Sequence, residues 1–281
     1  MDLNINKRNN VRCSGQGDKV LVFAHGFGCD QYVWDDIAPA FETKYRVVLF
    51  DYVGSGRSDK KAYSKERYST LHGYKQDLIE LCDALNLKNV VFIGHSVSSM
   101  IGALAAIDRP ELIKDLIMIG PSAHYLNEPG YQGGFERADI EGMLKMMETD
   151  YKEWANYLAP VVLQNGDRPE LAQEFEQILC SNDPDIMRQF AEATFLSDVR
   201  SDLQKVSVPT LILQMKNDAI APETAGEFVH SQIPESEYVV MNATGHNPHV
   251  SHAEETIEKI LAYLRKPMGN SNTSAIEKLS I

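Results

Sequence analysis

Short, uninterrupted apolar segments most constrain the fold of this chain. Residues 20–24, 45–50, 89–93 and 116–119 form such segments; they are rich in β-branched residues and do not alternate with polar positions. Runs of this kind are typical of strands buried on both faces, as in a parallel sheet. Between them, apolar residues recur at steps of three and four, which predicts helices. The alternation predicts an α/β fold with a mostly parallel, doubly wound sheet.

This alternation is interrupted between residue 120 and the next strand-like segment at 208–213. A crossover needs one helix, but this stretch holds four amphipathic helical patterns. The last begins with Asp183-Pro184, a good helix cap followed by a first-turn proline. The four patterns lie near residues 140–147, 151–158, 171–179 and 184–193.

These patterns predict an inserted lid subdomain at residues 122–204, because long insertions between core elements often cover active sites. The α/β core is then built from residues 1–121 and 205–265, with further strands near 211–214 and 238–241. The polar tail at residues 266–281 is expected to be flexible.

Charge and composition exclude several classes of protein. Among the 281 residues, 27 Lys and Arg face 40 Asp and Glu, a formal net charge of −13. Such a chain repels phosphate backbones and anionic membrane surfaces, so neither a nucleic acid nor a membrane is expected as a partner. No apolar run approaches the ~18 residues of a membrane span, and the first residues lack an apolar signal core. A cytoplasmic location is therefore expected.

The four cysteines do not indicate a metal or redox centre. They are scattered, and none forms a Cys-x-x-Cys pair, so a zinc ribbon or a thioredoxin-type motif is not expected. A disulfide framework is not expected either, since the predicted compartment is reducing. The cysteines are Cys13, Cys29, Cys82 and Cys180.

The segment Gly94-His95-Ser96-Val97-Ser98 lies where a predicted strand meets a predicted helix. A serine on this tight turn exposes its Oγ, and the helix N-terminus adds partial positive charge beside it. The usual pattern is Gly-x-Ser-x-Gly, and here another small residue, Ser98, stands at the last position. Taken alone, the segment fits equally well a serine that caps a buried helix.

A serine nucleophile needs a general base, and the base needs an acid that orients it. The expected chain order is Ser, then Asp or Glu, then His. Asp218 and His246 each follow a predicted strand, at the sheet edge where open α/β sheets carry their sites. We therefore predict a triad of Ser96, Asp218 and His246.

Other residues of the same types compete for these roles. Asp202 precedes its strand, whereas His249 and His252 are alternatives to His246. The three histidines could suggest a metal cluster, but glycine and proline break their spacing and no cysteine or carboxylate completes a site. Neither a metal nor another cofactor is expected.

The loop His25-Gly26-Phe27-Gly28 follows the first strongly predicted strand. It can bring the Phe27 backbone N–H to a developing oxyanion, opposite the N–H of Val97. An ordinary glycine turn is the alternative.

The inserted helices are rich in methionine and aromatic residues. Most such residues belong to a core, but some must form the ceiling of a site that the insertion covers. This predicts a small to medium, apolar and neutral substrate. The expected pocket residues are His95, Phe135, Met143, Trp154, Tyr157 and Phe195.

With these residues in hand, the sequence resembles the α/β-hydrolases over about residues 8–265. It resembles above all the bacterial RsbQ-like group, which regulates the sigma-B energy-stress response, and is similar to the plant strigolactone and karrikin receptors. The run Ser98-Ser99-Met100 is closer to the plant receptors. The resemblance rests on residues 25–34, 50–58, 94–99, 125–127, 133–136, 180–184 and 245–249.

The resemblance implies a Ser96-Asp218-His246 triad beneath a four-helix lid, with an oxyanion hole from the Phe27 and Val97 amides. It also implies a PAS-domain phosphatase as a partner. We therefore expect a serine hydrolase that acts on an ester, a lactone or a similar compound, in a stress-signalling role. The alternatives are a ligand-binding receptor with slow turnover and a general detoxifying carboxylesterase.

Overall fold

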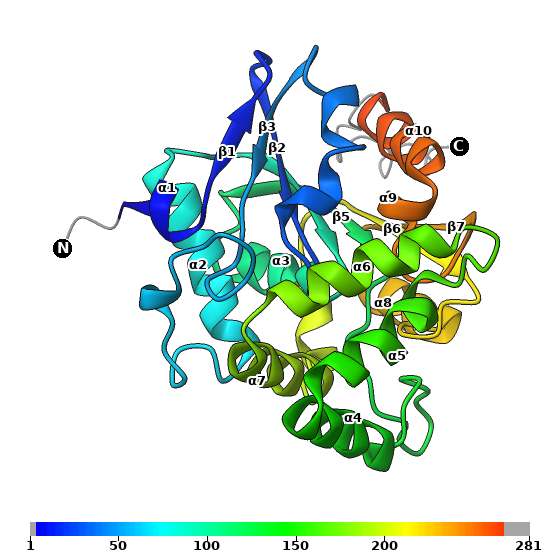
Figure 1. Cartoon of the computed structure of the whole chain (residues 1–281). Coiled ribbons are helices and arrows are strands. Elements are labelled where there is room, and N and C mark those ends of the chain that lie inside the picture. The colour runs from blue at the N-terminus through cyan, green and yellow to red at the C-terminus, as the bar shows by residue number, and fades with distance from the viewer. Residues whose placement is uncertain (1–3, 267–281) are drawn as a thin grey trace, which may run out of the picture.

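The buried apolar segments lie in one seven-stranded sheet in the computed structural model, which describes residues 4–266 (Figure 1). The strand order is β1-β3-β2-β4-β5-β6-β7. Every neighbouring pair is parallel except β1 and β3, which are antiparallel. The strands are β1 (Arg12–Ser14), β2 (Lys19–Ala24), β3 (Tyr45–Leu49), β4 (Val90–His95), β5 (Ile113–Ile119), β6 (Thr210–Lys216) and β7 (Ser236–Thr244).

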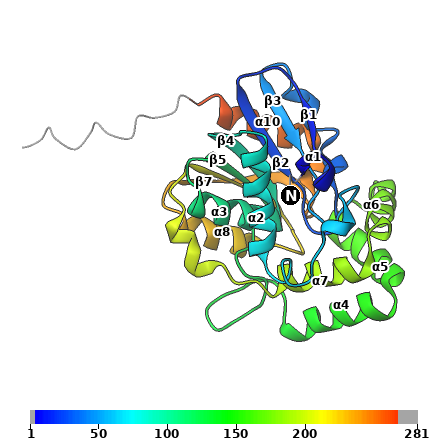
Figure 2. The ribbon, with the colours of Figure 1, turned by 90° about the vertical axis from the view of Figure 1, so that its left-hand side faces the viewer.

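Helices cover both faces of this sheet (Figure 2), as the doubly wound prediction required. The longer ones are α2 (Leu71–Ala84), α3 (Val97–Asp108), α8 (Glu223–Gln232) and α10 (Ala253–Leu264). Among the described residues, no helix combines the length and apolar character needed to cross a membrane. The short helices are α1 (Ile5–Arg8), α9 (Pro248–Ser251), and the 3-10 turns η1 (Gln31–Trp34), η2 (Ala38–Ala40), η3 (Lys60–Ala62) and η4 (Arg200–Lys205).

The insertion between β5 and β6 contains four helices, which confirms the predicted four-helix lid. They lie together at one end of the sheet (Figures 1 and 2). Asp183 caps the last of them, since its side chain accepts the N–H groups of Asp185 and Ile186. The helices are α4 (Arg137–Thr149), α5 (Tyr151–Leu163), α6 (Pro169–Ser181) and α7 (Pro184–Phe195).

Two predicted segments differ in extent from the strands that form. The segment at 208–213 starts as a strand only at Thr210, because Pro209 has no N–H to donate to a ladder. The segment at 238–241 extends to the full length of β7. The tail at residues 266–281, apart from Lys266, lies outside the described residues.

Candidate active site

Ser96 occupies a strained turn between β4 and α3. Its backbone angles are φ 57° and ψ −124°, which a non-glycine residue rarely adopts. Its N–H donates to the Ile119 carbonyl of β5 at 2.8 Å, which fixes the turn to the sheet. A Cβ at Gly94 would lie 2.7 Å from the Ser98 backbone, so only glycine fits there. The turn presents the Ser96 hydroxyl beyond the carboxyl end of β4.

The three residues predicted as a triad form a continuous hydrogen-bonded run. His246 Nε2 lies 2.8 Å from Ser96 Oγ, and His246 Nδ1 lies 2.7 Å from Asp218 Oδ2. The other carboxylate oxygen of Asp218 accepts the N–H groups of Ile220 and Ala221 at 2.8 and 3.0 Å. Asp218 is thereby oriented toward the imidazole. This is the geometry in which a serine can transfer its proton to histidine.

The competing residues lie elsewhere. Asp202 is in η4 and pairs with Lys205 at 2.6 Å. His252 contacts the Ser251 hydroxyl, and His249 stacks on Trp34 with 4.4 Å between ring centroids. Within residues 4–266, His, Cys, Asp and Glu side chains form no group of three arranged to hold a metal ion.

The backbone of His246 is attached to both the core and the lid. Its N–H donates to the Val162 carbonyl of α5 at 2.7 Å. Its carbonyl oxygen lies 2.9 Å from His95 Nε2. Just before it, Gly245 has φ 78° and approaches the C-terminal end of α5 so closely that a Cβ would lie 2.2 Å from the Leu163 oxygen. The site therefore depends on how α5 packs.

The two residues whose amides the sequence predicts for an oxyanion hole each follow a strand of the sheet. Phe27 follows β2 by three residues, and Val97 opens α3, where first-turn N–H groups have no helical acceptor. The Ser98 hydroxyl donates to the His25 carbonyl at 2.5 Å, and the Tyr52 hydroxyl lies 3.0 Å from it. Ser98 thus ties α3 to the loop that carries Phe27, a role that its small size alone did not reveal.

Aromatic rings fill the space between this loop and the lid. The Phe27 ring packs edge-on against Trp154, Phe190 and Phe195, with centroids 5.6 to 6.1 Å apart. Phe195 in turn contacts Tyr125 and Phe135 at 5.0 and 6.0 Å. The structure therefore brings together three of the predicted pocket residues, Phe135, Trp154 and Phe195.

Of the other three predicted pocket residues, Tyr157 and His95 lie away from this aromatic group. Met143 is half-buried on α4. Tyr157 is 64% exposed, because the buried face of α5 carries Trp154 and Leu158 and Tyr157 projects from the opposite side. The ring of His95 packs in the core instead, against His246 and His249.

Sequence reasoning missed Phe190 and the roles of the Phe27 ring and of Tyr125. Tyr125 is fully buried, and its hydroxyl has no hydrogen-bond partner of good geometry within the described chain. Burial raises the pKa of this phenol, and the neighbouring Ser96 hydroxyl lowers it in part. Tyr125 therefore lies beside the Ser96 hydroxyl. The sequence signal for Tyr125 was its position as a polar residue shortly after β5.

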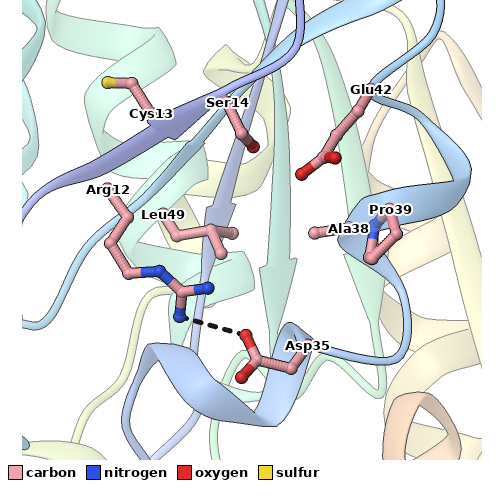
Figure 3. A pocket seen from close by; sticks show the side chains of 8 residues that line it. All are labelled: Arg12, Cys13, Ser14, Asp35, Ala38, Pro39, Glu42 and Leu49. Carbon is pink, nitrogen blue, oxygen red and sulfur yellow. Dashed lines mark hydrogen bonds and ion pairs between the residues drawn. The ribbon is translucent and has the colours of Figure 1, made fainter.

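The triad is closed off from bulk solvent, with Ser96 and His246 each 4% exposed. A surface cavity of about 330 Å³ lies beside the edge strand β1, and no triad or lid residue lines it (Figure 3). Within it Arg12 pairs with Asp35 at 3.0 Å. This cavity is therefore separate from the triad.

Comparisons with known proteins agree with this fold. Residues 19–253 match the sequence model of a family described as alpha/beta hydrolase fold. The chain is 37% identical over 262 residues to the karrikin insensitive 2 receptor CA of Petunia hybrida, covering 92% of this chain and 97% of the relative. It is 40% identical over 249 residues to the strigolactone esterase D14 of Arabidopsis thaliana, covering 88% and 93%. A solved hydrolase from Oleispira antarctica matches with a TM-score of 0.91 at 41% identity, covering 94% and 97%.

Proposed function

The chain belongs to the α/β-hydrolase family, and from that premise we propose that it is a serine hydrolase of a small, apolar, neutral ester or lactone. The observation that carries this proposal is the hydrogen-bonded run from Ser96 through His246 to Asp218. The comparison with a strigolactone esterase supports the same reaction type.

In the proposed reaction, Ser96 Oγ attacks the carbonyl carbon while His246 Nε2 takes its proton. Asp218 holds the imidazole through Nδ1 and stabilises its positive charge. The Phe27 and Val97 N–H groups stabilise the oxyanion of the tetrahedral intermediate. His246 then protonates the leaving oxygen. A water molecule, deprotonated by the same imidazole, attacks the acyl carbon, and the imidazolium returns the proton to Ser96 Oγ as the acyl bond breaks and the acid leaves.

The rings packed near the triad support the proposed substrate class. The rings of Trp154, Phe190 and Phe195, which we propose as the ceiling of the site, offer apolar surface and no charge. A charged substrate would lose its hydration there without gaining an ionic partner. The formal net charge of −13 further disfavours anionic substrates.

A fluorophosphonate probe tests this proposal, because it reacts only with an activated serine. We expect stoichiometric labelling of Ser96 and loss of both labelling and p-nitrophenyl acetate turnover in Ser96→Ala. Ser251→Ala is the matched control, since Ser251 is similarly buried and lies outside the site. A folded protein that the probe does not label, or turnover by Ser96→Ala, would contradict the proposal.

A second candidate function is that of a signalling receptor with slow turnover, which the similarity to a karrikin insensitive 2 receptor favours. Its output would be a protein contact that depends on the ligand. Ligand-dependent binding of a partner separates this role from that of a detoxifying carboxylesterase, which would use many substrates and need no partner. An RsbQ-like stress-signalling role, with a PAS-domain phosphatase as partner, rests on the sequence motifs.

Two further features belong to the proposal. We place the lid at residues 122–204 and the core at 1–121 and 205–265. We also propose a cytoplasmic location, which the four unpaired cysteine thiols support, since thiols are stable in a reducing compartment.

A further inference from the structure

We propose that His95 is a positioning residue that fixes the backbone of the general base, His246, relative to the nucleophile. This inference rests on the proposed serine hydrolase function and adds a residue to it. His95 directly precedes Ser96 in β4, and its imidazole reaches across to the base loop.

The hydrogen bond between the two residues determines which ring nitrogen of His95 carries the proton. Nε2 of His95 lies 2.9 Å from the His246 carbonyl oxygen, which can only accept. Burial and the neighbouring imidazoles of His249 and His246 hold the pKa of His95 well below its ordinary value, so the ring is neutral. A neutral ring that faces a carbonyl with Nε2 carries its single proton there. His95 is therefore a donor with one fixed tautomer.

This bond links the two reacting groups by a short path. One end is the side chain of the residue next to Ser96, and the other is the main chain of His246. The second backbone bond of His246, from its N–H, goes to Val162 in the lid. That bond holds the base in place only while α5 stays in place. The bond from His95 anchors the base to the core, independently of the lid.

The packing around His95 makes the bond rigid. Its ring centroid lies 4.8 Å from that of His246 and 4.4 Å from that of His249. On the side of the loop that carries Phe27, a Cβ at Gly26 would lie 2.5 Å from His95 Nδ1, so the ring has no room to rotate away. His95 is 2% exposed. Because the packed His95 ring cannot move, its hydrogen bond fixes the position of the His246 backbone.

His249 provides the internal comparison. It is as buried as His95 and stacks between His95 and Trp34, but neither of its ring nitrogens has a hydrogen-bond partner within the described chain. It contributes packing without a bond to the base. A variant of His249 therefore reports what the loss of a buried imidazole does by itself.

The experiment compares two amides at position 95. In His95→Gln the side-chain amide N–H lies near the position that Nε2 occupies in the wild type. In His95→Asn the side chain is shorter, so its amide N–H does not reach the His246 carbonyl. Stopped-flow acylation by p-nitrophenyl acetate and labelling by a fluorophosphonate give the reaction rate of Ser96. We expect His95→Gln to stay within about threefold of the wild type and His95→Asn to acylate about 10- to 100-fold more slowly, with KM nearly unchanged, because ångström-scale misplacement costs about that much.

Thermal unfolding shows which variants are folded, and His249→Phe, which keeps a ring against Trp34, is the control. We expect it to acylate within about twofold of the wild type. Equal rates for Gln and Asn at position 95, or a loss in His249→Phe as large as in His95→Asn, would overturn the inference. A wild-type protein that does not acylate would instead count against the proposed function.

Discussion

Replacing Gly245 with alanine should push the end of α5 away from the loop that carries His246. Gly245 immediately precedes His246 and packs against the last carbonyl groups of α5. It has φ 78°, in the region that residues with a Cβ enter at a cost of roughly 1–2 kcal/mol. That cost alone would lower stability and leave the site in place.

The clash with α5 is the larger effect. A Cβ at position 245 would lie 2.2 Å from the Leu163 oxygen, and real Cβ atoms essentially never come nearer than 3.0 Å. The end of α5, or the loop that carries His246, must therefore retreat by about 0.8 Å, from 2.2 to 3.0 Å. The hydrogen bond from the His246 N–H to Val162 would lengthen with it. Because misplacement of about 1 Å can cost about 100-fold in rate, we expect acylation of Ser96 to fall 10- to 100-fold.

Gly130→Ala is the matched control for this experiment. Gly130 has nearly the same backbone angle, φ 82°, but a Cβ there would meet nothing within 4 Å. Fluorophosphonate labelling gives the rate of Ser96, and urea unfolding gives the stability of each variant. Gly130→Ala should lose stability through backbone strain and label at the wild-type rate. If Gly245→Ala also labels at the wild-type rate, the contact between α5 and the base loop does not set the position of His246.

Two further substitutions test other contacts of the site. Ser98→Ala removes the hydroxyl that donates a hydrogen bond to the His25 carbonyl. It should lower the free energy of unfolding by about 1–3 kcal/mol. It should also slow labelling of Ser96, because the loop that carries Phe27 is no longer bonded to α3. Wild-type values in both assays would refute this. Burial, with the nearby His246 and His25, lowers the pKa of His249 to about 3 from 6.5. The unfolded chain therefore takes up the proton first, and stability present above pH 6.5 is lost as the pH falls toward 3. His249→Phe should reduce the loss between pH 7.5 and 5.5 by about 1.4 kcal/mol in urea unfolding, and an unchanged loss would contradict the assignment.

The sheet and the triad positions were predictable because both depend on local sequence. Uninterrupted β-branched runs indicate buried strands, and parallel strands bring their carboxyl ends to one edge. Ser96, Asp218 and His246 each follow such a run, so their meeting follows from the topology. The four lid helices were equally visible, since each carries its own apolar stripe.

Contacts between distant segments were not predictable in the same way. The composition of α5 made Trp154 and Tyr157 equivalent candidates, and only the packed helix distinguishes the buried ring from the exposed one. β1 is three residues long and too short to give a pattern. The bond from Ser98 to His25 joins residues 73 positions apart, and no spacing rule reports it.

The contacts of the lid bear on the choice between hydrolase and receptor. The Val162 carbonyl of α5 accepts the His246 N–H, and the Asn182 side chain at the end of α6 donates to the Gly28 carbonyl, in the loop that carries Phe27, at 2.9 Å. The ring of Phe27, from the same loop, packs against Trp154 of α5. The lid thus contacts both His246 and the loop that carries Phe27, so we expect a ligand that moves the lid to alter the geometry of the triad. The proposed hydrolase and receptor roles would therefore use the same site.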